Sequence, residues 1–247
     1  MMRMILLTLF LLTNAKAMEL QSSEKSASLV ELYTSESCSS CPPAEKWLNS
    51  LKDSATLWQD YVPVEFHVDY WNYLHWKDKY SSAEFSKRQR EYHKKIKGGV
   101  YTPQVIANGK NVRNWRRKSL TKKSPHKKQA GILKSNIDFK KGRIKVDFDP
   151  KRDRSLGSSY YCNFALMSGG IETKVKSGEN SGRSLKHEFV VRKFRKNELS
   201  KKGSKYSCEM RLPNNVLSNL KSPSVAVWVS SESTGEVLAA TGNWVKK

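Results

Sequence analysis

Two cysteines spaced as Cys-x-x-Cys, Cys38 and Cys41, are the residues of this sequence best suited to chemistry. A mostly apolar run over 29–33 predicts a short buried strand before them, and Pro42 and Pro43 follow them at the start of an amphipathic helix. A helix N-terminus stabilises a thiolate, and a second nearby cysteine can resolve a mixed disulfide. The pattern predicts thiol–disulfide exchange, with Cys38 as the attacking thiol and Cys41 as the buried resolving thiol.

The residues around the pair argue against strong activation of Cys38. A residue before proline is pushed away from the helical region, so the two prolines disfavour helical backbone at Cys41 and leave Cys38 a turn short of the helix. The loop contains no Lys or Arg, and the charge of Glu36 opposes a thiolate. We therefore expect a less depressed pKa than in strong oxidants. The alternative to an exchange enzyme is a non-enzymatic envelope protein that binds polyanions and has a stable, structural Cys38–Cys41 disulfide.

His67 supplies a further group near the predicted pair. It lies at the end of an alternating strand over 62–68, expected beside the first strand, where its imidazole can accept a proton from a cysteine. With Cys38 and Cys41 it also forms a possible copper or zinc site with one ligand position open. The alternative is a structural histidine bonded to the backbone. We expect no cofactor for exchange itself. The remaining histidines show no ligand spacing and are interpreted as surface or structural residues: His75, His93, His126 and His187.

Residues 1–17 have the pattern of a secretory signal peptide. Arg3 precedes an apolar core, small residues follow at Ala15 and Ala17, and cleavage is expected after Ala17. The core is about ten residues long, whereas a membrane-spanning helix needs about 20; a retained N-terminal anchor is the alternative. We expect a periplasmic or secreted protein without an integral membrane span in the mature chain. Its four cysteines then lie in an oxidising compartment.

The chain is strongly basic, with a formal net charge of +22, which falls to +20 when Arg3 and Lys16 leave with the signal peptide. Such a charge favours an anionic envelope polymer, a lipid surface or nucleic acid as partner. The alternative is a general preference for lysine, since the lysines are spread over most of the chain. Protein thiols or disulfides are the partners that the cysteine pair predicts. No Ser-His-Asp set, phosphate-binding loop or paired-carboxylate arrangement stands out.

Residues 28–111 alternate between strand and helix patterns. After the cysteine pair come a helical stripe, the strand over 62–68, a charged helix over 82–97 and a strand that ends at the turn Asn108-Gly109. An aromatic insert over 70–76 interrupts this order, either as a substrate platform over the dithiol or as filling of a domain interface. The order predicts an α/β thioredoxin-like domain.

Residues 112–141 form a basic connector, and residues 142–247 consist of short strands separated by turn signals. We expect this second segment to form an all-β sandwich-like domain. Cys162 and Cys208 each share a strand face with apolar residues, so both thiols are expected in one core. A structural disulfide between them is predicted, worth about 4 kcal/mol in the chain-entropy model. The alternative is two free, buried cysteines.

Several segments resemble the DUF1223 family, a group of secreted bacterial proteins with a thioredoxin-like region. In chain order they are VELYTSESCSSCPPAEKWL, FHVDYWNYLHWKD, FSKRQREY, VYTPQVIANG, GENSGRSLKHEFVVRKF and EVLAATGNW. The resemblance implies a cis-proline opposite the dithiol, at Thr102-Pro103, and places Pro103 in the site. An ordinary trans-proline at the start of a strand is the alternative. The family's function is not established, and the stretch over 111–117 departs from its usual short, more neutral helix.

Overall fold

The computed structural model describes residues 17–23, 27–96, 99–116, 131–150 and 159–246. Of the predicted signal peptide, Ala17 is described and the remainder lies outside the described residues. Most of the basic stretch of the predicted connector, 117–130, lies outside them as well. In the described part of the chain, no helix is both long and apolar enough to cross a membrane.

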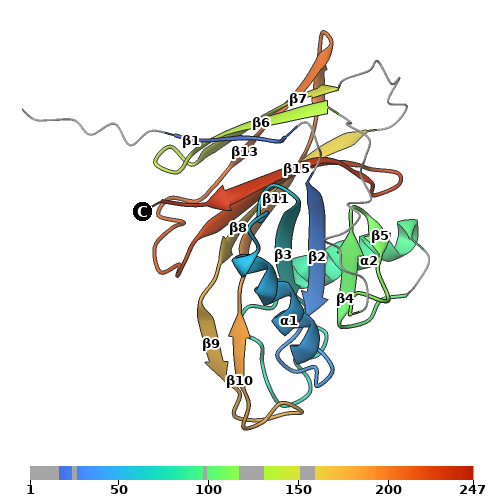
Figure 1. Cartoon of the computed structure of the whole chain (residues 1–247), viewed down its shortest axis with the longest axis vertical. Coiled ribbons are helices and arrows are strands. Elements are labelled where there is room, and N and C mark those ends of the chain that lie inside the picture. The colour runs from blue at the N-terminus through green and yellow to red at the C-terminus, as the bar shows by residue number, and fades with distance from the viewer. Residues whose placement is uncertain (1–16, 24–26, 97–98, 117–130, 151–158, 247) are drawn as a thin grey trace, which may run out of the picture.

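A sheet of eight strands forms the centre of the molecule and contains strands from both halves of the sequence (Figure 1). From edge to edge its strands are β15 (Val237–Trp244), β14 (Ser224–Ser231), β8 (Tyr160–Ser168), β11 (Val190–Glu198), β3 (Tyr61–His67), β2 (Ser28–Thr34), β4 (Gln104–Ala107) and β5 (Lys110–Asn111). Strands β2, β3 and β14 are buried along their whole length because other elements cover both faces.

A second sheet of five strands packs against the β8, β14 and β15 end of the first sheet (Figure 1). Its strands, in order, are β1 (Met18–Gln21), β6 (Gly131–Asp138), β7 (Arg143–Pro150), β13 (Lys205–Arg211) and β12 (Ser200–Lys202). Burial alternates along β6 and β7, as expected for strands with one face on a core. Val146 and Phe148 of this sheet share that core with Phe164 and Val227 of the larger sheet.

A disulfide between Cys162 of β8 and Cys208 of β13 joins the two sheets and confirms the predicted pairing. The two Cα atoms are 6.6 Å apart, and both residues belong to the shared apolar core. The phase of the strand patterns correctly placed both thiols on core-facing sides.

Two α-helices lie on opposite faces of β2 in the described part of the chain: α1 (Pro42–Asn49) and α2 (Ala83–Lys95). Glu31 of β2 contacts α2 through Arg88, whereas Thr34, three residues on and therefore on the other face, contacts Glu45 of α1. A short 3₁₀ helix, η1 (Ser50–Asp53), continues α1. The side chains of β2 thus point into two separate environments.

A two-stranded sheet, β9 (Ile171–Lys174) and β10 (Ser184–His187), packs against α1 (Figure 1). The Asn49 side chain of α1 fixes this contact. It donates from Nδ2 to the Lys186 carbonyl at 2.6 Å and accepts from the Glu188 amide at 3.0 Å. The residue between these two positions, His187, is therefore held beneath α1.

The predicted fold class, an α/β thioredoxin-like domain followed by an all-β sandwich-like domain, is wrong. The described chain is nearly all β, and β11 from the second half pairs in parallel with β3 from the first half, Val190 opposite Glu65. The Glu65 amide also donates to the Phe189 carbonyl at 2.9 Å. Without β11, the buried strand β3 would have an unpaired edge. Pairing of β11 with this edge joins the two halves of the sequence in one sheet. In addition, the range predicted as a connector, 112–141, contains strand β6.

Candidate functional site

The cysteine pair lies where β2 leads into α1. The Cys38 amide donates to the Ser35 carbonyl, and the Cys41 amide donates to the Cys38 carbonyl, each at 3.1 Å, so the loop is a compact turn. Cys41 has helical backbone angles and α1 begins at Pro42, contrary to the expectation that the prolines displace Cys41 from the helical region. Proline suits a first helical position because the amide there needs no partner within the helix.

Both thiols are reduced in the described structure, and they have opposite electrostatic environments. A hydrogen bond from Cys41, together with contacts to Ser40 and Thr102, lowers the pKa of the Cys38 thiol to about 6, although burial acts in the opposite direction. Burial and the neighbouring Cys38 raise the pKa of Cys41 well above its usual value. Near neutral pH, Cys38 is the thiolate and Cys41 is the thiol that donates to it.

Trp71 of the aromatic insert positions the Thr102 hydroxyl. Thr102 Oγ1 donates to Cys38 Sγ at 3.2 Å and accepts from the Trp71 indole Nε1 at 2.7 Å. The Thr102–Pro103 bond is cis, as predicted, and it precedes β4. Trp71 stacks on Tyr73, whose side chain is 70% exposed. An exposed aromatic surface therefore adjoins the residues that hold Cys38.

A segment from the second half of the chain, with Glu179 and Asn180, holds the cysteine loop through hydrogen bonds. Asn180 Nδ2 donates to the carbonyls of Glu36 and Cys38 at 2.9 and 3.0 Å, and the Ser39 amide donates to Glu179 Oε2 at 3.0 Å. Asn180 is fully buried. Sequence reasoning missed this support, for which the Glu-Asn pair in the segment GENSGR was the available signal.

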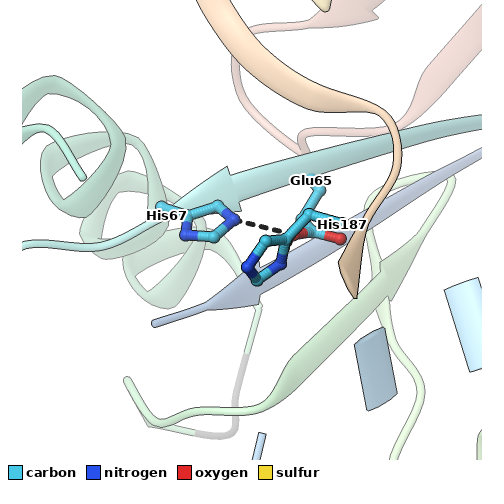
Figure 2. Close-up of side chains that lie close together, drawn as sticks. All are labelled: Glu65, His67 and His187. Carbon is cyan, nitrogen blue, oxygen red and sulfur yellow. Dashed lines mark hydrogen bonds and ion pairs between the residues drawn. The ribbon is translucent and has the colours of Figure 1, made fainter. Parts of the chain in front are cut away.

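Beside the cysteine loop lies a buried cluster of acids and histidines, which Figure 2 shows in part. His67 of β3 is fully buried, with Nδ1 2.7 Å from Asp78 Oδ2 and Nε2 2.7 Å from Glu65 Oε1. Burial lowers the pKa of His67, but the carboxylates of Asp78 and Glu65 outweigh this effect and raise the pKa well above its usual value. His67 is thus bonded to side chains, whereas the structural alternative expected a bond to the backbone.

His187 at the end of β10 completes the cluster from the second half of the chain. It is fully buried, which excludes the surface location and leaves the structural one of the two that the sequence suggested. Its Nε2 lies 3.3 Å from Glu36 Oε1, and its Nδ1 lies 3.4 Å from Glu65 Oε1 and 3.6 Å from Glu45 Oε2. Burial opposes the charged form, yet the carboxylates raise the pKa of His187 to about 10.

Thr34 connects this cluster to the cysteine pair. Its hydroxyl donates to Glu45 Oε1 at 2.5 Å, and its side chain lies close enough to Cys41 to lower the pKa of that thiol against the effect of burial. Burial raises the pKa of the Glu45 carboxyl to about 7. The cluster therefore adjoins the buried thiol, while Cys38 faces Thr102 and the aromatic insert.

The structure separates residues that the sequence grouped as one possible metal site. Among the described residues, one group of three potential ligands has its atoms within 4.8 Å of one another, and it consists of Glu65, His67 and His187. Cys38 and Cys41 do not belong to it. Glu65 and His67 share one face of β3, and two polar residues in phase within an apolar strand were the signal available in the sequence.

This fold and site define a β-rich protein in which a cysteine pair adjoins a buried histidine–carboxylate cluster. Residues 29–230 match the family DUF1223, described as a protein of unknown function. The chain belongs to this family.

Two solved structures share the fold. The crystal structure of protein AGR_C_4864 from Agrobacterium tumefaciens is 24% identical, with a TM-score of 0.62, and the match covers 91% of this chain and 94% of that one. HBP35 of Porphyromonas gingivalis is 12% identical, with a TM-score of 0.63, and the match covers 92% and 77% of the two chains. At these identities the likeness concerns the fold alone. Among curated proteins, no sequence matches this chain.

Proposed function

We propose that the protein catalyses thiol–disulfide exchange on protein substrates through Cys38 and Cys41. The observation that carries this proposal is the asymmetry of the pair. Cys38 accepts hydrogen bonds that favour its thiolate, whereas Cys41 is buried as a thiol. A thiolate is the attacking species in exchange, and a neighbouring protonated thiol is suited to resolve the mixed disulfide.

The reaction balances without a cofactor. The Cys38 thiolate attacks one sulfur of a substrate disulfide, a Cys38–substrate bond forms, and the other substrate sulfur leaves as a thiolate. Cys41 gives its proton to the first leaving thiolate, and its sulfur then attacks Cys38 Sγ and releases the second substrate thiolate. Two electrons pass from the protein to the substrate, and the protein retains a Cys38–Cys41 disulfide. The reverse sequence oxidises a substrate dithiol, and an external thiol or disulfide resets the pair.

The aromatic surface beside Thr102 supports a protein as the substrate. Tyr73 is exposed and stacks on Trp71, whose indole holds the Thr102 hydroxyl against Cys38. Exposed aromatic side chains supply contact area at a low cost in conformational entropy. A substrate segment on Tyr73 is therefore placed next to the attacking sulfur.

The reduction potential of the pair tests the proposal. The protein is equilibrated with glutathione buffers, and the fraction of oxidised Cys38–Cys41 is followed by thiol alkylation and peptide mass spectrometry. We expect a value between about −120 and −270 mV, the range of exchange catalysts. A value below about −300 mV marks a structural disulfide and overturns the proposal.

Two single variants test the roles within the pair. Cys38→Ser is expected to abolish exchange with a disulfide-containing protein, and Cys41→Ser is expected to accumulate a mixed disulfide at Cys38. The matched control is the double variant Cys162→Ala, Cys208→Ala, whose altered residues lie in the other core. Full exchange activity in both single variants contradicts the assignment.

We also propose that the protein acts in the periplasm or outside the cell. The Cys162–Cys208 disulfide supports this location because structural disulfides persist in oxidising compartments. Fractionation of cells that express the full chain tests it, with N-terminal sequencing of the product. The expected product begins at Met18, and an uncleaved cytoplasmic product overturns the proposal.

A further inference from the structure

We propose that Glu65, His67 and His187 bind a divalent transition-metal ion of the Zn²⁺ type, at a site separate from the Cys38–Cys41 pair. The three ligand atoms lie within 4.8 Å of one another and are buried (Figure 2). Two imidazoles and one carboxylate are ligands that zinc prefers, and three protein ligands leave one position for water or another oxygen donor.

The distances fit a metal between His187 and Glu65. Their Nδ1 and Oε1 atoms are 3.4 Å apart. Two ligands of a tetrahedral zinc, each bound at about 2.1 Å, are separated by about 3.4 Å. The His67 Nε2 and Glu65 Oε1 atoms are closer, at 2.7 Å, because they are hydrogen-bonded. To ligate through Nε2, His67 must give up this bond, and the separation of the two atoms must open by about 0.7 Å to reach the ligand spacing of a tetrahedral zinc.

Unpartnered buried atoms are the second observation that points to a ligand. Neither ring nitrogen of His187 has a hydrogen-bond partner among the described residues, although the side chain is fully buried. Glu65 Oε2 is also buried without a hydrogen-bond partner among the described residues. Buried polar atoms are nearly always hydrogen-bonded, and each exception calls for an explanation. A bound metal ion supplies one for His187, since it takes up the Nδ1 nitrogen as a ligand.

Protonation of His187 alone leaves its contacts poorly explained. An imidazolium among three carboxylates donates short, linear hydrogen bonds, typically of about 2.7–2.9 Å. Its contacts with Glu36, Glu45 and Glu65 are 3.3–3.6 Å long and none has hydrogen-bond geometry. The side chain lies at ion-pair distance from all three carboxylates, and no contact is as short as a direct charged hydrogen bond.

The surroundings orient the ligands as a metal site requires. The carboxylate of Asp78 accepts from His67 Nδ1, which turns Nε2 toward the cluster, and Asp78 is itself fixed by the amides of Glu36 and Tyr80, each at 2.9 Å. A carboxylate behind a ligating histidine is the common arrangement of zinc sites. Asn49 holds the backbone on both sides of His187 against α1.

Metal loading of the full chain tests the proposal. Protein treated with a chelator is dialysed against Zn²⁺ and its metal content is measured by mass spectrometry; we expect one ion per chain. Loading with Co²⁺ is expected to give ligand-field absorption bands without the near-ultraviolet band of thiolate–cobalt charge transfer. Absence of stoichiometric metal, or a thiolate band, overturns the proposal.

Matched variants assign the ligands. We expect His187→Gln and Glu65→Gln to lose the metal, and the double variant Cys38→Ser, Cys41→Ser to retain it. Unchanged binding by His187→Gln, or loss of binding in the cysteine variant, contradicts the assignment. These outcomes are independent of exchange activity, which depends on the cysteines.

A further measurement covers the case in which the cluster variants do not fold. Wild-type protein labelled with ¹⁵N at histidine is titrated with Zn²⁺, and the ring nitrogens are followed by NMR. The His67 Nε2 and His187 Nδ1 resonances are expected to shift at one equivalent, while those of the exposed His93 stay unchanged. No shift at His67 and His187 overturns the site without any substitution.

Discussion

At the scale of single residues, hydroxyl groups and a thiol, not cations, set the reactivity of Cys38. Hydrogen bonds from Cys41, Ser40 and Thr102 lower its pKa. The loop contains no Lys or Arg, as the sequence shows, and a pKa of about 6 agrees with the expectation that the thiol is less activated than in strong oxidants. Thr102 contributes from 64 positions away, which explains why local spacing could not reveal it.

The first prediction concerns the pH dependence of Cys38 alkylation. A thiolate reacts and a thiol does not, so the alkylation rate is expected to rise with pH through about 6 and to level off above 7, in accordance with the lowered pKa. Cys41, with its raised pKa, is expected to remain unmodified over the same range. Iodoacetamide labelling with peptide mass spectrometry measures both. A midpoint at the ordinary thiol pKa, about 8.5, contradicts the assigned environment.

Thr102→Val provides the second prediction. The substitution keeps the shape of the side chain and removes the hydroxyl that donates to Cys38 Sγ. A hydrogen bond to a charged group contributes about 1.5–3 kcal/mol, so the pKa of Cys38 is expected to rise by about one unit or more. The alkylation profile measures this shift. Thr173→Val is the matched control, because its buried hydroxyl has no partner among the described residues, and its profile is expected to match the wild type.

At the scale of secondary-structure elements, one buried ion pair fixes α2 to the central sheet. Arg88 of α2 donates to Glu31 Oε2 of β2 from Nε at 3.0 Å and from Nη2 at 2.8 Å. Tyr92 and Tyr33 donate to the same carboxylate. The group is fully bonded, unlike the histidine cluster on the opposite face of β2, and its role is to join helix and sheet.

Arg88→Met is therefore predicted to destabilise the fold strongly. It leaves the Glu31 carboxylate buried without its cation, which typically costs about 3–5 kcal/mol. Chemical denaturation measures the change in the free energy of unfolding. Arg90→Met on the exposed side of α2 is the control, with an expected effect of about 0.5 kcal/mol or less. Equal effects of the two substitutions would contradict this account of Arg88.

The elements were largely predictable from the sequence, but their partners were not. Alternation predicted a strand over 62–68, and the structure has β3 at Tyr61–His67; the charged helix expected over 82–97 is α2 at Ala83–Lys95. Such features depend on neighbours in the chain. The pairing of Val190 with Glu65 depends on contacts between distant segments, and no local period records it. His187 was missed for the same reason, since its burial follows from the packing of β10 on α1.

At the scale of the whole molecule, the Cys162–Cys208 disulfide ties the two sheets together across 46 positions of sequence. Replacing both residues with alanine is predicted to lower the free energy of unfolding by about 4 kcal/mol, the chain-entropy value for a loop of this length. Denaturant unfolding under non-reducing conditions measures it. The double variant Cys38→Ser, Cys41→Ser is the comparison, because these residues are three positions apart and a bond between them closes only a very short loop. A larger loss in that variant would contradict the division between structural and reactive cysteines.

The bond from Asn180 to the Cys38 carbonyl joins positions 142 residues apart. A ribosome releases the chain from the N-terminus, so Cys38 and Cys41 emerge long before the segment that closes their loop and before His187 of the neighbouring cluster. For most of its synthesis the polypeptide carries an uncovered thiol pair. The complete site can form only when translation has passed residue 187. A message truncated earlier yields a chain with both cysteines but without Asn180 or His187.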